Sequence, residues 1–127
     1  MVTRLQVIGG GNMGEALIRG LVADGWAPAK ELLVVEPIAE KRDYLTRSIS
    51  ELRCSGRAKG DVDTVLAVKP DVVADVCASL SELGVQRILS IAAGVRIERL
   101  EALLGPRTKV VRAMPNTPAL VRQGIAA

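Results

Sequence analysis

A glycine-rich string near the amino terminus is the strongest chemical signal in this chain. It reads Gly-Gly-Gly-Asn-Met-Gly over residues 9–14 and contains the spacing G-x-G-x-x-G. Glycines at these positions permit a tight turn, a close approach of backbone to a pyrophosphate, and close packing of a helix on a strand. The N–H groups that begin the following helix favour an anion without any basic side chain. The residues of this string that we expect to bind a dinucleotide are Gly9, Gly11, Asn12, Met13 and Gly14.

The residues around this string determine how much weight it carries, because glycine-rich chains meet the same spacing by chance. An apolar run from Arg4 to Ile8 precedes it, apolar residues at helical spacing follow it, and Glu36 closes the next apolar run. This order of strand, glycine turn, helix and acid is typical of dinucleotide-binding βαβ units. A purely structural glycine turn is the alternative interpretation.

Three side chains at the end of the second apolar run and shortly after it affect the choice between NAD and NADP. Glu36 stands where a carboxylate can accept hydrogen bonds from the adenosine ribose, which favours NAD and repels a 2′-phosphate. Lys41 and Arg42 follow on an exposed helix, where they either bind the 2′-phosphate of NADP or simply face the solvent. The cofactor, NADP or NAD, is therefore left open by these residues.

Short apolar runs alternate with helical patterns along the chain, as in a parallel sheet built from βαβ units. The expected strands are Arg4–Ile8, Leu32–Glu36, Leu52–Cys54, Thr64–Val68, Arg87–Ile91 and Lys109–Arg112. Glycines interrupt residues 55–63, which are too few for a full crossover helix, so we expect a loop or a single turn there. The pattern predicts one domain over residues 1–127, an α/β fold of the doubly wound Rossmann type with a mainly parallel sheet between two helix layers.

Apolar stripes at helical spacing predict which helix faces pack on this sheet. The first stripe consists of Met13, Ala16, Leu17, Gly20 and Leu21, and the second consists of Val72, Val73, Val76, Cys77 and Leu80. A third helical pattern runs from Ile97 to Leu104. Gly25 follows the first pattern, where a left-handed helix cap is expected, and Gly84 and Gly105 end the second and third patterns.

The composition excludes several classes of protein. The chain has no His, so Ser-His-Asp and Cys-His hydrolases are excluded. No metal site is expected either, and Cys54 and Cys77 are expected to be reduced and buried. Aromatic residues make up only 2%, and the cations behind the net charge of +3 are scattered, which favours a phosphate-bearing small molecule over nucleic acid. No apolar run approaches the roughly 20 residues of a membrane span. With no signal-peptide pattern either, we expect a soluble, cytoplasmic protein.

Four segments of the chain resemble pyrroline-5-carboxylate reductase. They are VIGGGNMGEAL from Val7, AVKP from Ala67, SIAAGV from Ser90 and VVRAMPNTPALVRQG from Val110, and together they span almost the whole chain. The last segment is the most specific, because a generic Rossmann fold does not need an Arg-x-Met-Pro-Asn-Thr-Pro string. All four follow the carboxyl ends of expected strands, which is the edge where ligands of open parallel sheets bind.

The resemblance implies cofactor contacts in three further segments. The resemblance implies that the adenosine and its ribose contact Val68, Lys69 and Pro70. It implies that the nicotinamide lies near Ala92, Ala93 and Gly94. The nicotinamide ribose and amide would then be held by Met114, Pro115 and Asn116. Pro70 has a structural alternative as the first residue of a helix, and Gly94 as a simple turn. Asn116 lies in a loop stiffened by two prolines, which suits the presentation of an amide to a ligand.

The activity that the resemblance implies is hydride transfer from NADPH or NADH to the C=N carbon of 1-pyrroline-5-carboxylate, which yields L-proline and completes proline biosynthesis. In the family, a following helical domain binds the substrate carboxylate, handles the proton and builds the dimer. We therefore assign no catalytic residue, expect a homo-oligomer only for a full-length protein, and expect the 127-residue chain to bind cofactor but to be inactive alone.

Two alternatives remain open. The first is another two-domain reductase that shares this cofactor half, such as a β-hydroxyacid dehydrogenase or a coenzyme F420:NADP oxidoreductase, although the MPNTP segment argues against both. The second is a non-catalytic nucleotide-binding module that binds a partner.

Overall fold

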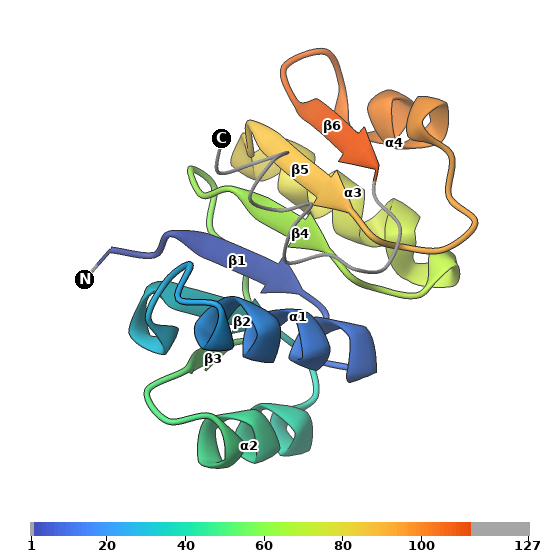
Figure 1. Ribbon diagram of the computed structural model, residues 1–127. Coiled ribbons are helices and arrows are strands. Elements are labelled where there is room, and N and C mark those ends of the chain that lie inside the picture. Colours follow the sequence, from blue (N-terminus) through green and yellow to red (C-terminus); the bar gives the residue numbers. More distant parts are fainter. Residues whose placement is uncertain (1, 113–127) are drawn as a thin grey trace.

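The structure, a computed structural model, describes residues 2–112 (Figure 1). Its sheet has the strand order β3-β2-β1-β4-β5-β6, and every neighbouring pair is parallel. The strands are β1 (Leu5–Ile8), β2 (Leu32–Val35), β3 (Arg53–Ser55), β4 (Thr64–Leu66), β5 (Arg87–Ser90) and β6 (Lys109–Arg112). This order is that of a doubly wound sheet, which is the fold class predicted from the sequence. Its direction reverses between β1 and β4, the point where such sheets bind ligands.

Helices connect the strands on both faces of the sheet, with α1 and α2 on one face and α3 and α4 on the other (Figure 1). The α-helices are α1 (Asn12–Ala23), α2 (Ala39–Ser48), α3 (Val73–Leu83) and α4 (Ile97–Leu104), and the short 3-10 helices are η1 (Ala29–Glu31) and η2 (Pro70–Val72). The predicted bounds of α4 and β6 are confirmed. No helix within residues 2–112 is long and apolar enough to cross a membrane.

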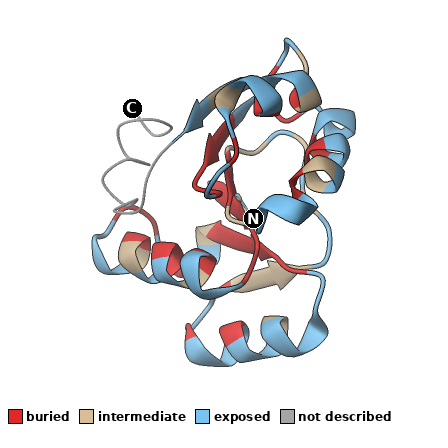
Figure 2. Ribbon diagram, turned by 90° about the vertical axis from the view of Figure 1, so that its right-hand side faces the viewer, coloured by how far each residue is buried: buried red, intermediate tan, exposed pale blue. Residues whose placement is uncertain are grey.

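The hydrophobic core consists of two layers, one on each face of the sheet. On β2, Leu32 and Val34 pack in the layer that contains α1, whereas Leu33 and Val35 pack in the layer that contains α3 and α4. Successive side chains of a strand point to opposite faces, so a strand that is apolar throughout must be covered on both sides. Figure 2 shows these buried strands between helices whose outer faces are exposed. The predicted three-layer arrangement is confirmed.

The buried face of α1 differs from the predicted stripe. Met13 is 41% exposed, Ala16 is exposed, and Gly20 is only half-buried. The face that packs on the sheet consists of Gly14, Leu17, Ile18 and Leu21. The helix is turned in this way because Gly14 lies against the carbonyl of Gly9, where a Cβ would stand 2.0 Å from the oxygen. On α3 the prediction is closer, since Val73, Cys77 and Leu80 are buried, but Val76 is half-buried and Val72 precedes the helix and is exposed.

Glycines end the helices where the sequence predicts them. Gly84 caps α3 with φ +76°, and Gly105 follows α4 with φ +89°. After α1, Gly25 has φ +78° and donates its N–H to the carbonyl of Val22, while Trp26 donates to the carbonyl of Leu21. This pair of hydrogen bonds is a Schellman motif, which uses carbonyls that the helix itself leaves free.

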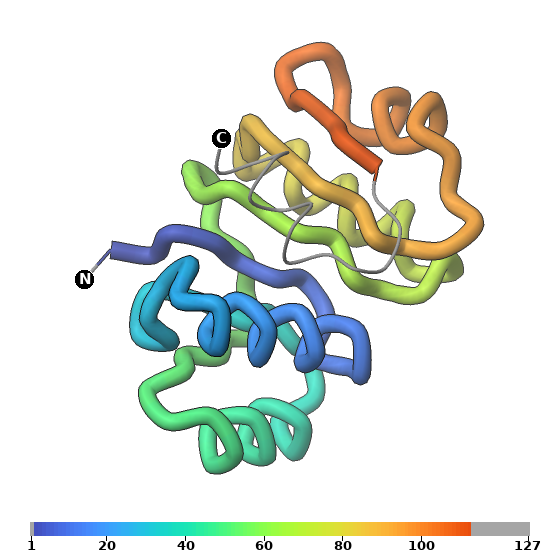
Figure 3. Tube along the Cα trace, viewed as in Figure 1, coloured from blue at the N-terminus to red at the C-terminus, as the bar shows by residue number. Residues whose placement is uncertain are grey.

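The connection from β3 to β4 contains no helix, as predicted, and Figure 3 traces it along its length. The side chain of Gln6, fully buried on β1, anchors it. Gln6 Nε2 donates to the carbonyl of Lys59 at 2.8 Å, and Gln6 Oε1 accepts the N–H of Lys59 at 2.8 Å. A Cβ on Gly60 would stand 2.4 Å from the carbonyl oxygen of Leu83, so the loop also lies tightly against the end of α3. One buried amide thus ties the short loop to the sheet where a crossover helix would otherwise pack.

Both cysteines are free thiols. Cys77 on α3 is buried as predicted, but Cys54 is only half-buried because it lies on β3, a strand at the edge of the sheet. Burial raises the pKa of both thiols. They are therefore less ionised at neutral pH than free cysteine, and neither has the environment of a reactive nucleophile.

Candidate functional site

The glycine string forms the turn between β1 and α1, and two of its glycines are required by the protein itself. Gly9 has φ +112°, and a Cβ there would stand 2.4 Å from the carbonyl oxygen of Ala67. Gly14 is equally confined by the carbonyl of Gly9. At Gly11, in contrast, a Cβ would meet no atom within 4 Å. Steric confinement therefore accounts for Gly9 and Gly14 but does not require glycine at Gly11.

Helix α1 begins at this open space. Gly11 is its N-cap, and no side chain caps the helix. The first N–H groups of an α-helix have no partner within the helix, and they carry the positive end of its dipole. A phosphate group in front of Gly11 would accept these hydrogen bonds and gain from the dipole. The open space and the uncapped helix start therefore fit a pyrophosphate.

The acid in the first turn of α1 is paired with two neighbouring side chains. The carboxylate of Glu15 accepts hydrogen bonds from Arg19 at 2.9 Å and from the hydroxyl of Tyr44 at 2.9 Å. The bond from Arg19 is the main reason why the pKa of Glu15 lies below its usual value. The charge of Glu15 is thus paired on the surface and does not oppose an anion at the helix start.

A cleft of about 1150 Å³ extends from the carboxyl edge of the sheet, beside the glycine turn, along α3 to Leu83 at the end of that helix. It contains six of the residues predicted to bind the cofactor, which are Gly9, Gly11, Glu36, Lys41, Val68 and Lys69. They come from segments that are far apart in sequence but follow the neighbouring strands β1, β2 and β4. The parallel sheet brings them together because the carboxyl ends of its strands meet at one edge.

The other predicted residues have different positions. Those that lie outside the lining of the cleft are Asn12, Met13, Gly14, Arg42, Pro70, Ala92, Ala93 and Gly94. Pro70 is the first residue of η2, which is its structural alternative, and Gly94 has φ +74° in the turn after β5. Ala92 is buried and Ala93 is exposed beyond the carboxyl end of the same strand. The remaining three, Met114, Pro115 and Asn116, lie outside the described residues.

Glu36, which was expected to be the last residue of the second strand, follows β2 directly, and its carboxylate is already engaged by the backbone. The residue is 5% exposed. Its Oε1 accepts the N–H of Gly10 at 2.8 Å, and its Oε2 accepts the N–H of Ile38 at 2.9 Å. Glu36 thus links the glycine turn to the loop between β2 and α2.

Of the cations near Glu36, one is bound to the backbone and two line the cleft. Arg42 is half-buried, and its Nη1 donates to the carbonyls of Glu36 at 2.7 Å and Pro37 at 3.0 Å. Lys41 is exposed and lines the cleft. Arg57, which the sequence reasoning did not single out, lines the cleft from the loop after β3. Its one sequence signal is a basic residue shortly after the third strand, at the carboxyl edge where ligands bind.

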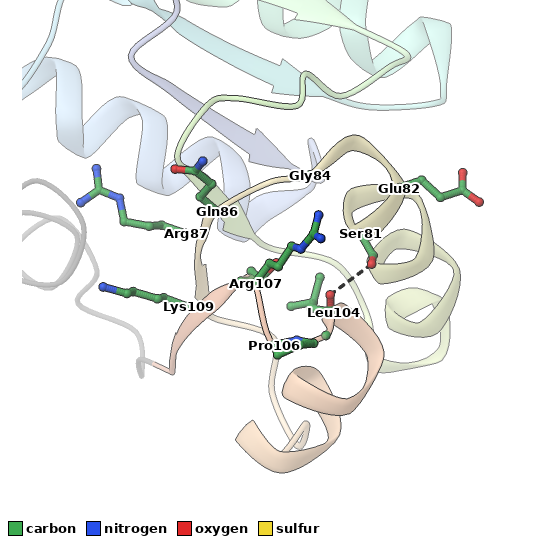
Figure 4. Close-up of a pocket in the computed structure, with 11 residues that line it drawn as sticks. Ser81, Glu82, Gly84, Gln86, Arg87, Leu104, Pro106, Arg107 and Lys109 are labelled. Carbon is green, nitrogen blue, oxygen red and sulfur yellow. Dashed lines mark hydrogen bonds between the residues drawn. The ribbon is translucent and has the colours of Figure 1, made fainter.

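A second cavity, of about 810 Å³, lies at the opposite edge of the sheet, beside the ends of α3 and α4 (Figure 4). Its cations are Arg87, Arg107 and Lys109. Arg87 is already paired with Asp63, and Arg107 lies beside the carboxyl ends of the two helices, whose negative partial charge it complements. Ser81 also donates to the carbonyl of Leu104 here, at 3.1 Å. The carboxyl-edge cleft is therefore the candidate functional site.

Known proteins share both this fold and this sequence. The profile of the family described as NADP oxidoreductase, coenzyme F420-dependent, matches residues 4–94. A pyrroline-5-carboxylate reductase of Haemophilus influenzae is 44% identical over 124 residues, which cover 94% of this chain and 45% of the relative. The chain thus spans about half the length of the curated relatives that it matches.

Solved structures agree with these sequence matches. A pyrroline-5-carboxylate reductase from Coxiella burnetii superposes with a TM-score of 0.80 at 31% identity, covering 96% of this chain and 47% of that one. The Plasmodium falciparum pyrroline carboxylate reductase, with NADP bound, superposes with a TM-score of 0.71 at 27% identity, covering 94% and 44%. Because the family profile matches more than half of its residues, this chain belongs to the NADP oxidoreductase, coenzyme F420-dependent family, and its similarity to pyrroline-5-carboxylate reductases extends beyond the profile to almost its full length.

Proposed function

We propose that this chain is the NADP-binding half of a pyrroline-5-carboxylate reductase. The observation that carries the proposal is the open space at Gly11, which lies in the cleft and faces the uncapped start of α1. The family description names NADP, and the Plasmodium falciparum relative binds it. NADP is therefore the proposed cofactor, with NAD as the alternative at the same site.

The residues of the cleft have distinct tasks in this proposal. The pyrophosphate lies at Gly11 and the start of α1, where N–H groups of Asn12 and Met13 are available to it. Glu36 holds the glycine turn in place through the N–H of Gly10. The adenosine extends toward Lys41, Val68 and Lys69. When bound, NADPH supplies the hydride, and this chain binds and orients it.

The nicotinamide end of the cofactor is assigned only by the family resemblance. We propose that it extends from the glycine turn toward Ala92, Ala93 and Gly94, which follow β5, the strand beside β4. Met114, Pro115 and Asn116 would complete this part of the site.

The activity of the whole protein follows from the same resemblance. We propose reduction of 1-pyrroline-5-carboxylate to L-proline in the cytoplasm, by a homo-oligomer. Residues 1–127 would form the cofactor-binding domain, and a helical domain of the kind found in the family would bind the substrate and handle the proton. The chain by itself is then expected to bind cofactor without appreciable turnover.

Two observations help to choose between the proposed function and its alternatives. The family profile, whose description names coenzyme F420, ends at residue 94, whereas the match to a pyrroline-5-carboxylate reductase covers 94% of the chain. This extension favours the pyrroline reductase over a β-hydroxyacid dehydrogenase or an F420:NADP oxidoreductase. A non-catalytic module would bind cofactor equally well, and only turnover distinguishes it.

The first test is a calorimetric titration of the chain with NADPH and then NADH at fixed salt concentration. We expect saturable binding of at least one of them, with NADPH the tighter ligand. A folded chain that binds neither would contradict the proposal. Oxidation of NADPH that depends on 1-pyrroline-5-carboxylate, measured on the gene product in full, separates the reductase from a binding module.

A further inference from the structure

We propose that Arg57 is the residue that selects NADP over NAD in this chain, by holding the 2′-phosphate of the adenosine ribose. The proposal rests on the proposed function, because it names the specificity residue of the same cofactor site. It also reassigns Glu36 from a ligand of the ribose to a positioning residue of the glycine turn.

Arg57 lies where the adenosine ribose of a dinucleotide is recognised. In doubly wound folds the residue that closes the second strand marks this position, and an arginine nearby accommodates the 2′-phosphate. Here that residue is Glu36, and its N–H donates to the carbonyl of Ser55 at 2.8 Å, at the end of β3. Arg57 follows Ser55 by two positions and lines the cleft together with Glu36 and Lys41. The loop after β3 therefore brings Arg57 to the edge of the ribose position.

The guanidinium group of Arg57 is available for a ligand. Arg57 is exposed, and within residues 2–112 its side chain takes part in no hydrogen bond or ion pair. Arg42, the other arginine near this edge, donates to two backbone carbonyls and lies outside the lining of the cleft. Lys41 does line the cleft, but a lysine offers a phosphate a point charge, whereas an arginine can bind it through two parallel hydrogen bonds.

Glu36 does not oppose a 2′-phosphate in the way that an acid at this position usually does. An acid that favours NAD presents its carboxylate to the ribose hydroxyls. Both carboxylate oxygens of Glu36 instead accept backbone N–H groups, from Gly10 and Ile38, and only 5% of the residue is exposed. Its position is held further by Arg42, which donates to its carbonyl. The acid is thereby used to shape the glycine turn.

The backbone around Arg57 is held on both sides, so the side chain starts from a fixed point. The N–H of Arg57 donates to Ser55 Oγ at 3.0 Å. Two residues later, Lys59 is bound through its N–H and its carbonyl to the buried amide of Gln6. A loop anchored in this way loses little further freedom when a ligand binds, which favours affinity. The absence of a crossover helix between β3 and β4 thus places a short, anchored, basic loop beside the cofactor.

The test compares Arg57→Ala, Arg57→Lys and Lys59→Ala in the chain as it stands. Lys59→Ala is the matched control, because it removes the same charge from the same loop at a side chain that does not line the cleft. Calorimetry measures the dissociation constants of NADPH and NADH, and of 2′,5′-ADP and 5′-ADP as smaller probes. We expect Arg57→Ala to weaken NADPH and 2′,5′-ADP about tenfold or more and to change NADH and 5′-ADP less than twofold. Arg57→Lys should fall between Arg57→Ala and wild type, and Lys59→Ala should resemble wild type.

Other results would overturn the proposal in distinguishable ways. If wild type binds both cofactors but Arg57→Ala leaves NADPH unchanged, weakens NADPH and NADH equally, or matches Lys59→Ala, then Arg57 does not read the 2′-phosphate while the proposed function stands. If wild type binds neither cofactor, the proposed function fails and this inference fails with it. Thermal unfolding of each variant checks the fold, and Arg57→Lys supplies the comparison should Arg57→Ala fail to fold.

Discussion

Replacing Gly11 by Ala separates a glycine required by the ligand from glycines required by the fold, and Gly14→Ala is its matched control. Both changes add one methyl group to the same turn. At Gly11 the new Cβ meets nothing within 4 Å, whereas at Gly14 it stands 2.0 Å from the carbonyl oxygen of Gly9. The structure therefore predicts that Gly11→Ala keeps its stability but binds the cofactor more weakly. Gly14→Ala, in contrast, should destabilise the fold.

The effect on stability follows from these contacts. Ala is a poorer N-cap than Gly by about 1 kcal/mol or less, and the loss is partly offset by about 0.4–1 kcal/mol from the restricted unfolded chain. Gly11→Ala should therefore change the free energy of unfolding by less than about 1 kcal/mol. Gly14→Ala forces a backbone shift in a packed turn and should cost about 1–3 kcal/mol or more. In thermal unfolding, each 1 kcal/mol corresponds to a shift of roughly 4 °C for a domain of this size.

Gly11→Ala should weaken cofactor binding even though it hardly changes stability. Its added methyl group would occupy the space proposed for the pyrophosphate, so we expect NADPH affinity to fall at least about tenfold, or 1.4 kcal/mol, although the fold is retained. Calorimetric titration at fixed salt measures this, and thermal unfolding confirms that the variant is folded. Gly11→Ala with wild-type affinity for NADPH would refute the reasoning, because the pyrophosphate could not then lie against Gly11.

Three further changes test other parts of the structure. Glu36→Gln replaces one carboxylate oxygen by an amide that cannot accept a backbone N–H, so it should cost about 1–3 kcal/mol in urea denaturation and weaken NADPH and NADH alike; a selective gain in NADPH affinity would contradict the positioning role. Gln6→Leu should cost about 1–3 kcal/mol, because both polar backbone groups of Lys59 lose their buried partner, and hydrogen exchange at the Lys59 amide should accelerate; unchanged protection would show that the loop is held elsewhere. Arg19→Ala should raise the pKa of Glu15 toward its ordinary value of 4.5, observed by NMR titration. Because the folded pKa is lowered, the small stabilisation from this surface pair is present above pH 4.5 and is lost as the pH falls, and a variant with the wild-type pKa would show that Arg19 is not its cause.

Most of the fold could be predicted from the sequence because its signals are local. A run such as Leu32–Val35 is apolar throughout and short, which identifies a strand covered on both faces. Gly84 and Gly105 end helices through their own backbone conformation, so their positions need no knowledge of the remaining chain. The loop at residues 55–63 was predicted for the same reason, since it is too short and too rich in glycine for a helix.

The predictions that failed depended on side-chain and backbone contacts that hydrophobic spacing does not reveal. Helical spacing alone allows α1 to turn either Met13 or Gly14 toward the sheet, and the carbonyl of Gly9 decides for Gly14. Likewise, the sequence places Glu36 at the end of a strand but does not say that two backbone N–H groups occupy its carboxylate.

The candidate site, like the fold, is predictable from the sequence only in part. The sequence by itself predicted the glycine turn, the doubly wound fold and the edge of the sheet proposed for the dinucleotide, because spacing and hydrophobic pattern are properties of neighbouring residues. Only the tertiary structure decided which cations face the cleft, because Lys41 and Arg57 follow different strands and meet only when β2 and β3 pair. It also decided that Arg42 donates to the carbonyls of Glu36 and Pro37, because the orientation of its side chain toward the folded loop between β2 and α2 cannot be read from sequence spacing.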